Sequence, residues 1–231
     1  MKALFYADWC TIRETFARTV LVCAIVAVPM VAASYTDGSD APGVFAATIV
    51  TVMPIFYFML GLFGADEQAG WQEVRLALPV TPSSVVRARY AFLALAGFGA
   101  ALVGTLCGLL TNVLFSAFAK LMVPRGVFTI AASALGVAAF GLAYMALLMP
   151  MAFKIGISKA RVYFTLPFFI PLLLNVPPVR DAFAGMTSQL EHMSDAMGTP
   201  LPLLAAGFLV CVAVYLVSMR VSERVYAARD F

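Results

Sequence analysis

Long stretches without charged residues alternate with short polar segments along this chain. The charge-free stretches define predicted spans at 19–36, 43–65, 90–117, 127–151, 162–179 and 200–219. Each is close to or above the roughly 17–25 apolar residues with which a helix crosses the hydrocarbon core. The pattern therefore predicts an all-α membrane protein, a single domain over 1–231 with six transmembrane helices. The third and fourth apolar stretches exceed one bilayer thickness, so their ends are expected to project or tilt.

Residues 1–18 are predicted to form an elbow helix that lies in the membrane surface. Phe5, Trp9, Ile12 and Phe16 recur at helical spacing and give the helix one apolar face. The alternative is that this segment begins the first span, with Trp9 as an interfacial anchor. Its acidic and aromatic residues do not resemble a signal peptide, so the first span is expected to be an uncleaved anchor.

Two further features leave their roles open. The outer segment 180–199 is predicted to be an amphipathic helix, because Phe183, Met186, Leu190, Met193 and Met197 recur every three or four residues. This helix either re-enters the membrane before the last span or caps its surface. In the third span, Gly104 and Gly108 lie four residues apart, a spacing that lets helices approach closely. Packing within the bundle and contact with a second chain both fit this pair.

The distribution of Lys and Arg predicts the orientation of the spans. Twelve of these residues fall on one side of the six spans: Lys2, Arg13, Arg18, Arg75, Arg87, Arg89, Lys154, Lys159, Arg161, Arg220, Arg224 and Arg229. Only Lys120, Arg125 and Arg180 fall on the other side. Because basic residues are retained in the cytoplasm, both termini are predicted to be cytoplasmic.

Composition excludes several classes of protein. Hydrophobic residues make up 63% of the chain and charged residues 12%, far from the balance of a soluble domain. The net charge of +3 follows from membrane topology, so nucleic acid is not an expected partner and membrane lipid is. No ionisable residue lies inside a predicted span, which counts against a carrier driven by protons or cations. The sequence contains no G-x-x-x-x-G-K-[ST] loop, so energy for uphill transport would come from another chain.

No catalytic or metal site is predicted. His192 is the only histidine, and with Asp195 alone it lacks the further ligands that a metal needs. No Ser/His pair is available inside the spans for a hydrolase. No two of the four cysteines form a C-x-x-C pair, and apolar packing explains them. We therefore expect a chain that is not an enzyme and holds no cofactor of its own.

The segment 66–89 is the most unusual part of the chain, because it combines acidic residues, Trp71 and arginines between two apolar spans. Exposed apolar residues beside Trp and Arg are typical of a protein interface. A loop that rests on lipid headgroups is the alternative. Thr81 followed by Pro82 predicts the start of the third helix. That helix would carry Arg87 and Arg89 at the lipid interface.

The segment resembles the first cytoplasmic loop of small ATP-binding-cassette export permeases of the second class. The resemblance rests on Asp66-Glu67, Gly70-Trp71, Ala77-Leu78-Pro79-Val80-Thr81, Val85-Val86 and Arg89-Tyr90. It implies a six-helix permease in the bacterial cytoplasmic membrane, with 66–89 as the loop that couples it to a cytoplasmic ATPase subunit. Pro82 departs from the basic residue of many relatives, so no charge contact is expected at that position.

The resemblance also implies partners and contact residues. ATPase contacts would be Asp66, Glu67, Gly70, Trp71, Glu73, Arg75, Leu78 and Pro79. A second contact would be Lys154, Lys159 and Arg161. ATP and Mg²⁺ would be bound by the ATPase, and a second, identical or different permease chain would complete the transporter.

The implied activity is the export of a hydrophobic or amphipathic substrate, such as a peptide or drug, driven by ATP hydrolysis in the partner. A close variant is the membrane subunit of a haem exporter, although the sequence shows no signature of that system. A membrane scaffold or sensor whose loop binds a cytoplasmic partner is an alternative from another class. A lipid-modifying enzyme fits least, because paired acids or histidines are missing at the interface.

Overall fold

The computed structural model describes four long helices and several shorter pieces of the chain. The described residues are 6, 8–11, 13, 19, 22–23, 42–68, 81–119, 126–156, 159–160, 162–163, 185, 188 and 201–228. The long helices are α2 (Pro42–Gln68), α4 (Pro82–Ala119), α5 (Val127–Ile155) and α8 (Leu201–Ala227). No strand occurs among these residues. All 4 helices are long and apolar enough to cross a membrane, so the chain is an all-helical membrane protein.

These helices cover the second, third, fourth and sixth predicted spans. The first span lies outside the described residues except for helical positions 19, 22 and 23, and the fifth except for helical positions 162 and 163. Of the predicted elbow helix, residues 6, 8–11 and 13 are described and are helical. The outer segment 180–199 is described only at helical positions 185 and 188. The count of six spans and the elbow helix therefore stay predictions.

The boundaries of α4 and α5 follow from local chemistry. The carbonyl oxygen of Thr81 accepts hydrogen bonds from the backbone N–H groups of Ser84 and Val85, at 2.9 and 3.3 Å, as an N-cap residue does. The sequence therefore places the start of this helix correctly. Helix α5 ends at Gly156, whose φ of 81° favours glycine. With 38 residues, α4 is about 57 Å long and exceeds the hydrocarbon core of about 30 Å.

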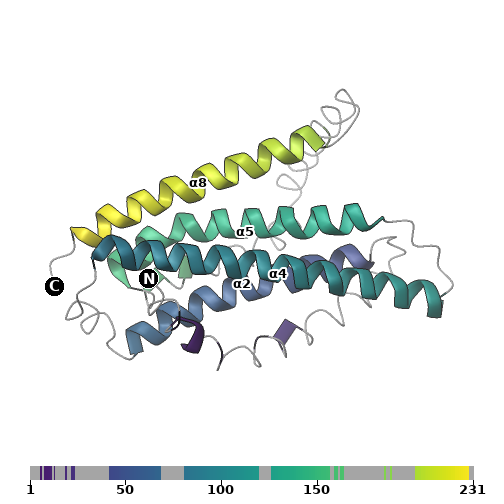
Figure 1. Ribbon diagram of the computed structural model, residues 1–231, viewed down its shortest axis with the longest axis horizontal. Coiled ribbons are helices and arrows are strands. Elements are labelled where there is room, and N and C mark those ends of the chain that lie inside the picture. The colour runs from purple at the N-terminus through teal and green to yellow at the C-terminus, as the bar shows by residue number, and fades with distance from the viewer. Residues whose placement is uncertain are drawn as a thin grey trace.

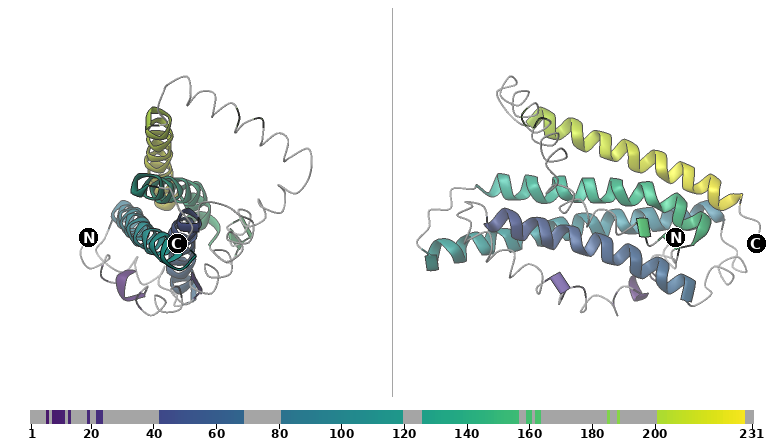
Figure 2. Two further views of the ribbon diagram at one scale, coloured as in Figure 1. Left: turned by 90° about the vertical axis from the view of Figure 1, so that its right-hand side faces the viewer. Right: turned by 180° about the vertical axis from the view of Figure 1, so that it is seen from behind.

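Helices α2, α4 and α5 pack side by side, and α8 lies at an angle to them (Figure 1). Both views in Figure 2 show the same divergence of α8 from α5. The apolar core lies between the first three helices and includes Ile55, Met59, Val86 and Met149. Only Ser218, Ser222 and Tyr226 are buried on α8. The described structure is thus a three-helix body with α8 attached near one end.

Glycines bring α2 and α4 into backbone contact. A Cβ atom at Gly43 would lie 2.6 Å from the carbonyl oxygen of Gly108, and a Cβ atom at Gly104 would lie 2.7 Å from that of Ala47 and collide with the hydroxyl of Thr51. Real Cβ atoms do not approach so closely, so only glycine fits without a shift. Of the two roles open for Gly104 and Gly108, the structure shows packing within the chain.

Candidate functional site

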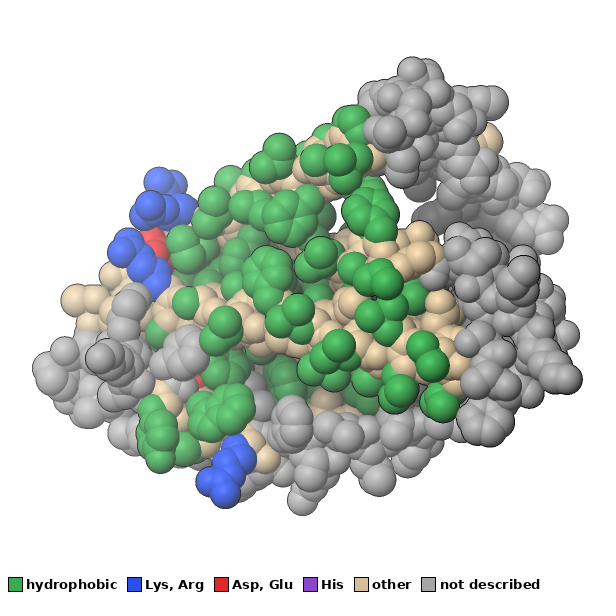
Figure 3. All heavy atoms as spheres, turned by 45° about the vertical axis from the view of Figure 1, so that its right-hand side comes forward, with side chains coloured by type: hydrophobic (Ala, Val, Ile, Leu, Met, Phe, Trp, Pro, Cys, Tyr) green, Lys and Arg blue, Asp and Glu red, His purple; other side chains and the backbone are tan. Residues whose placement is uncertain are grey.

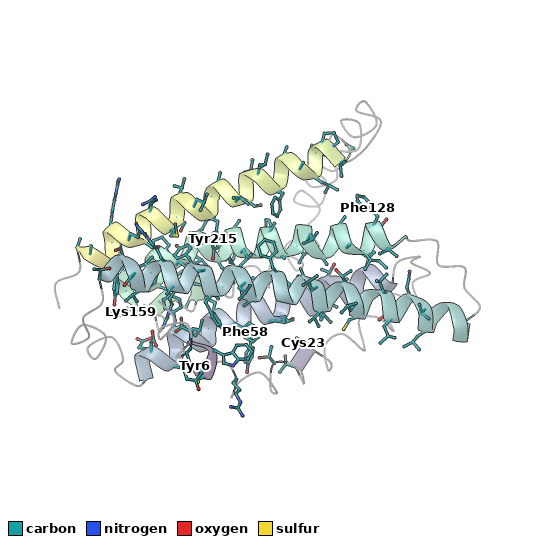
Figure 4. The ribbon with its side chains drawn as sticks, in the orientation of Figure 1. Tyr6, Cys23, Phe58, Phe128, Lys159 and Tyr215 are labelled. Atoms are coloured by element: carbon teal, nitrogen blue, oxygen red, sulfur yellow. The ribbon has the colours of Figure 1, made fainter. Side chains whose placement is uncertain are left out.

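The ends of the four long helices meet at one end of the bundle, where α2, α5 and α8 finish and α4 begins (Figure 1). We call this the charged end. It is defined by Asp66, Glu67, Arg87, Arg89, Lys154, Arg220 and Glu223. On the face drawn in Figure 3, hydrophobic side chains cover the bundle and charged ones lie toward one end. In Figure 4, Lys159 lies at the charged end and Phe128 at the opposite end.

Arg89 is the centre of a buried ionic cluster at the charged end. The residue is 1% exposed, and its Nη2 donates a hydrogen bond to the carboxylate of Asp66 at the end of α2. A second carboxylate, that of Asp8, lies 3.6 Å from the same nitrogen and is also buried. The cluster therefore joins the N-terminal segment, α2 and α4.

An aromatic row supports this cluster. The guanidinium carbon of Arg89 lies 4.7 Å from the ring centre of Phe63, a distance typical of a cation–π contact. Phe63 packs edge-to-face on Phe153 of α5 at 5.1 Å, and Phe153 packs in the same way on Tyr226 of α8 at 5.3 Å. Removing a charge from water costs several kcal/mol unless partners surround it. Asp66, Asp8 and Phe63 supply such partners here.

Beside Arg89, Tyr90 joins α4 to α8 through hydroxyl groups. Its phenolic oxygen lies 2.8 Å from the hydroxyl oxygens of both Ser218 and Ser222. The Ser218 hydroxyl donates to the carbonyl oxygen of Ala146 on α5. Because a hydroxyl has one proton, Ser218 then accepts from Tyr90, and Tyr90 accepts from Ser222. The backbone carbonyl of Tyr90 accepts a further bond of 2.6 Å from the Tyr215 hydroxyl. Figure 4 shows Tyr215 where α8 lies close to the other helices.

An ion pair on the surface adds a second link between α4 and α8. Arg87 Nε donates to Glu223 Oε1 at 2.5 Å, and Arg220 lies 3.6 Å from the other oxygen of that carboxylate. The side chain of Arg87 is 47% exposed, so water weakens this pair. One turn of α4, 87–90, thus contacts α2, α8 and the N-terminal segment.

The structure describes only some of the residues that were assigned to contact with the ATPase. Asp66 and Glu67 belong to the last turn of α2, and Asp66 points into the buried cluster. A Glu67 carboxylate oxygen lies 3.1 Å from where a Cβ atom of Gly156 would be, so the ends of α2 and α5 touch. Lys154 and Lys159 flank this glycine and are exposed. Outside the described residues lie Gly70, Trp71, Glu73, Arg75, Leu78, Pro79 and Arg161.

The expectation that Arg87 and Arg89 both lie among lipid headgroups is wrong for Arg89. Protein groups enclose Arg89, because two carboxylates and an aromatic ring surround it. Sequence reasoning also missed Asp8 as the second acidic partner. The candidate span in the structure runs from Ser83 to Leu114 and so includes Arg87 and Arg89, whereas the sequence prediction began this span at residue 90.

The hydroxyl contacts of α8 were missed as well, although the sequence carries a signal for them. Tyr215, Ser218, Ser222 and Tyr226 are spaced by three, four and four residues, which places them on one face of a helix. A polar stripe on an otherwise apolar helix indicates the face that packs on protein. The partner, Tyr90, could not be identified without the three-dimensional arrangement.

The contacts at the charged end link helix ends to one another. Asp66 pairs with Arg89 and Glu223 pairs with Arg87, and within the described residues no group of three or more His, Cys, Asp or Glu is placed to hold a metal ion. What the cluster provides is a fixed connection between segment ends. Asp66 and Arg89 lie on either side of 67–88, so their ion pair brings the two ends of that segment together.

Comparison with known proteins identifies the family. No curated protein and no solved structure matches the chain. The sequence profile described as "ABC-2 family transporter protein" matches residues 3–227, nearly the whole length. Such a match agrees with the all-helical fold and with apolar helices long enough to span a membrane. The chain therefore belongs to the ABC-2 family of transporter proteins, as a membrane permease component of an ATP-binding-cassette exporter.

Proposed function

We propose that a cytoplasmic ATPase subunit docks on segment 66–79 of this permease and drives export of a hydrophobic or amphipathic substrate, such as a peptide or drug. Trp71 anchors the contact, and Glu67 and Glu73 pair with basic groups of the ATPase. Lys154, Lys159 and Arg161 make a second contact. The ATPase binds ATP and Mg²⁺, and a second permease chain completes the transporter.

The single observation that supports this proposal most strongly is that the described residues of the two assigned contacts lie together at the charged end. Glu67 lies against Gly156, and Lys154 and Lys159 flank that glycine. The Asp66–Arg89 ion pair ties both ends of 67–88 to the same place. One docked subunit can therefore reach both contacts.

Co-purification with the ATPase tests the docking site. We expect the variant Trp71→Ala with Glu73→Ala to lose most of the bound ATPase, because a central Trp contact of an interface contributes about 2 kcal/mol or more. The measurement is the ratio of ATPase to permease after affinity purification of the permease from membranes. Arg180→Ala, on the side assigned to the exterior, is the matched control and should retain the ATPase.

Unchanged association and unchanged ATP hydrolysis in the double variant would rule out the coupling role. Association with a partner that hydrolyses no ATP would instead favour the scaffold or sensor function. Export is tested separately, by comparing the accumulation of fluorescent hydrophobic peptides and dyes in cells with and without the gene. Equal accumulation of every compound in cells with and without the gene would contradict the proposed substrate class.

We propose that the charged end faces the cytoplasm and that both termini lie there, in a bacterial inner membrane. The bias of basic residues toward this side supports the orientation. A reporter enzyme that is active only in the cytoplasm, fused after Phe231, should be active. A second reporter, active only outside the cytoplasm and fused at the same position, should be inactive. Activity of this second reporter would show that the orientation is reversed.

A further inference from the structure

Among the described residues, all buried positions of helix α8 lie in its C-terminal half, toward the charged end. The hydroxyls of Ser218 and Ser222, the ring of Tyr226 and the carboxylate of Glu223 all contact neighbouring helices. Between residues 201 and 214 no position is buried. The views in Figures 1 and 2 agree that this part of α8 diverges from α5. Contacts with the described residues therefore restrain the C-terminal half of α8 more than its N-terminal half.

The other three long helices are joined along their length. At the end opposite the charged end, Gly43 and Gly108 place the backbones of α2 and α4 in contact, and a Cβ atom at Gly108 would lie 2.8 Å from Ile130 of α5. Farther along, a Cβ atom at Gly97 would lie 2.8 Å from Leu142 of α5. At the charged end Asp66 binds Arg89. Close packing at one end and a buried ion pair at the other leave little room for relative movement of these three helices.

We propose that Tyr90 is a positioning residue for transport and forms, with Ser218 and Ser222, the pivot on which α8 swings relative to a rigid α2–α4–α5 body. This inference rests on the proposed function, because the displacement originates where the ATPase docks on 66–79. The segment leads directly into α4, and Tyr90 lies two turns into that helix. A movement of the loop therefore reaches α8 through Tyr90.

The chemistry of the contact suits a pivot. Hydroxyl groups rotate and exchange partners, and Tyr90 lies equally far, at 2.8 Å, from two serines one helical turn apart. The ring of Tyr215 packs edge-to-face on that of Tyr90 at 5.1 Å and keeps the helices in contact while the angle changes. Hydrogen bonds between membrane helices are weak on average, so these bonds can rearrange during a transport cycle.

Distances between spin labels test the pivot. The permease, with Cys10, Cys23, Cys107 and Cys211 replaced by serine, is reconstituted with its ATPase in lipid membranes. Labels are placed at Leu106 of α4 and Leu209 of α8, both exposed. Trapping with MgATP and vanadate should shift the distance between them. A second pair, Leu106 with the exposed Phe140 of α5, should show no shift, because α4 and α5 belong to one body.

Tyr90→Phe removes the hydroxyl and leaves the ring. We expect the nucleotide-dependent shift at Leu106–Leu209 to be lost and the nucleotide-free distance distribution to broaden. Ser222→Ala should act in the same direction. The matched control is Tyr144→Phe, which removes a hydroxyl that donates to the carbonyl oxygen of Tyr163 at 2.7 Å, away from the pivot. The control should keep both the shift and the narrow distribution.

A Tyr90→Phe protein with an unchanged shift and an unchanged width would overturn the pivot. So would a parent protein that traps nucleotide without moving α8, or a shift of equal size at Leu106–Phe140. If no ATPase binds to the permease, the proposed function fails, yet the pivot is still tested. In that case the test is the width of the Leu106–Leu209 distance distribution in the permease alone. Equal widths for Tyr90→Phe and its parent protein would exclude the pivot.

Discussion

The two flanks of α4 are held by different kinds of contact. On the flank toward α2, Gly104 and Gly108 bring backbone against backbone, and Arg89 is buried beside Asp66. On the flank toward α8, the contacts are hydroxyl groups near Tyr90 and an exposed ion pair. Backbone contact leaves no rotamer to adjust, whereas hydroxyls can find new partners. This difference is the basis for the proposed rigid α2–α4 pair and movable α8.

The largest effect is expected from removing the buried cation of Arg89, which tests whether the flank toward α2 is held rigidly. Arg89→Ala leaves Asp66 and Asp8 buried without their shared partner, and loss of one member of a buried pair costs about 3–5 kcal/mol. We expect a large fall in the unfolding temperature of the detergent-purified permease, measured by circular dichroism. Arg220→Ala, which removes a side chain that is 68% exposed, is the control. Similar unfolding temperatures for the two variants would show that the cluster is not a rigid joint.

A smaller effect is expected at the glycine contact. Gly104→Ala puts a methyl group against the Ala47 carbonyl and the Thr51 hydroxyl, and overpacking of this kind costs about 1–3 kcal/mol. Gly99 lies on the same helix with nothing within 4 Å of its Cβ position. Gly99→Ala is therefore a matched control and should be neutral or slightly stabilising. Equal unfolding temperatures for the two alanine variants would mean that α2 and α4 can move apart without a loss of stability.

Much of this fold was predictable because membrane spans are read from local apolar length. The charge-free stretches locate α2, α4, α5 and α8, and Thr81-Pro82 gives the start of α4. Apolar length alone places a helix end less well. Residues 66–68 continue α2 although the sequence assigns them to a loop, because Asp66 is satisfied inside the bundle by Arg89.

The candidate site was less predictable because its contacts join residues far apart in the chain. Asp8 and Arg89 are 81 residues apart (89 − 8), and Tyr90 contacts Ser222 across 132 residues. No periodicity in a single sequence encodes such pairs. The residues of 66–90 that resemble export permeases include Arg89 and Tyr90, and both prove to lie at the junction between helices.

The flank toward α8 should tolerate change better than the flank toward α2. Tyr90→Phe removes two hydrogen bonds, to Ser218 and Ser222, and bonds between membrane helices contribute about 0.6 kcal/mol each on average, or about 1.2 kcal/mol for the pair. We expect a fall in unfolding temperature smaller than that of Gly104→Ala in the same assay. A fall as large as that of Arg89→Ala would mean that the hydroxyl contacts hold α8 rigidly, contrary to a pivot.

The smallest effect is expected at the surface ion pair of Arg87 with Glu223. The Arg87 side chain is largely in water, so solvent and salt screen its attraction to the carboxylate. Glu223→Gln keeps the size of the side chain and removes its charge, and the unfolding temperature should stay within error of the parent protein at physiological salt. A small difference should emerge at low salt and vanish as salt is raised. A difference independent of salt would show that the pair is shielded from solvent and salt as in a protein interior, and that the α8 flank is more rigid than its exposure indicates.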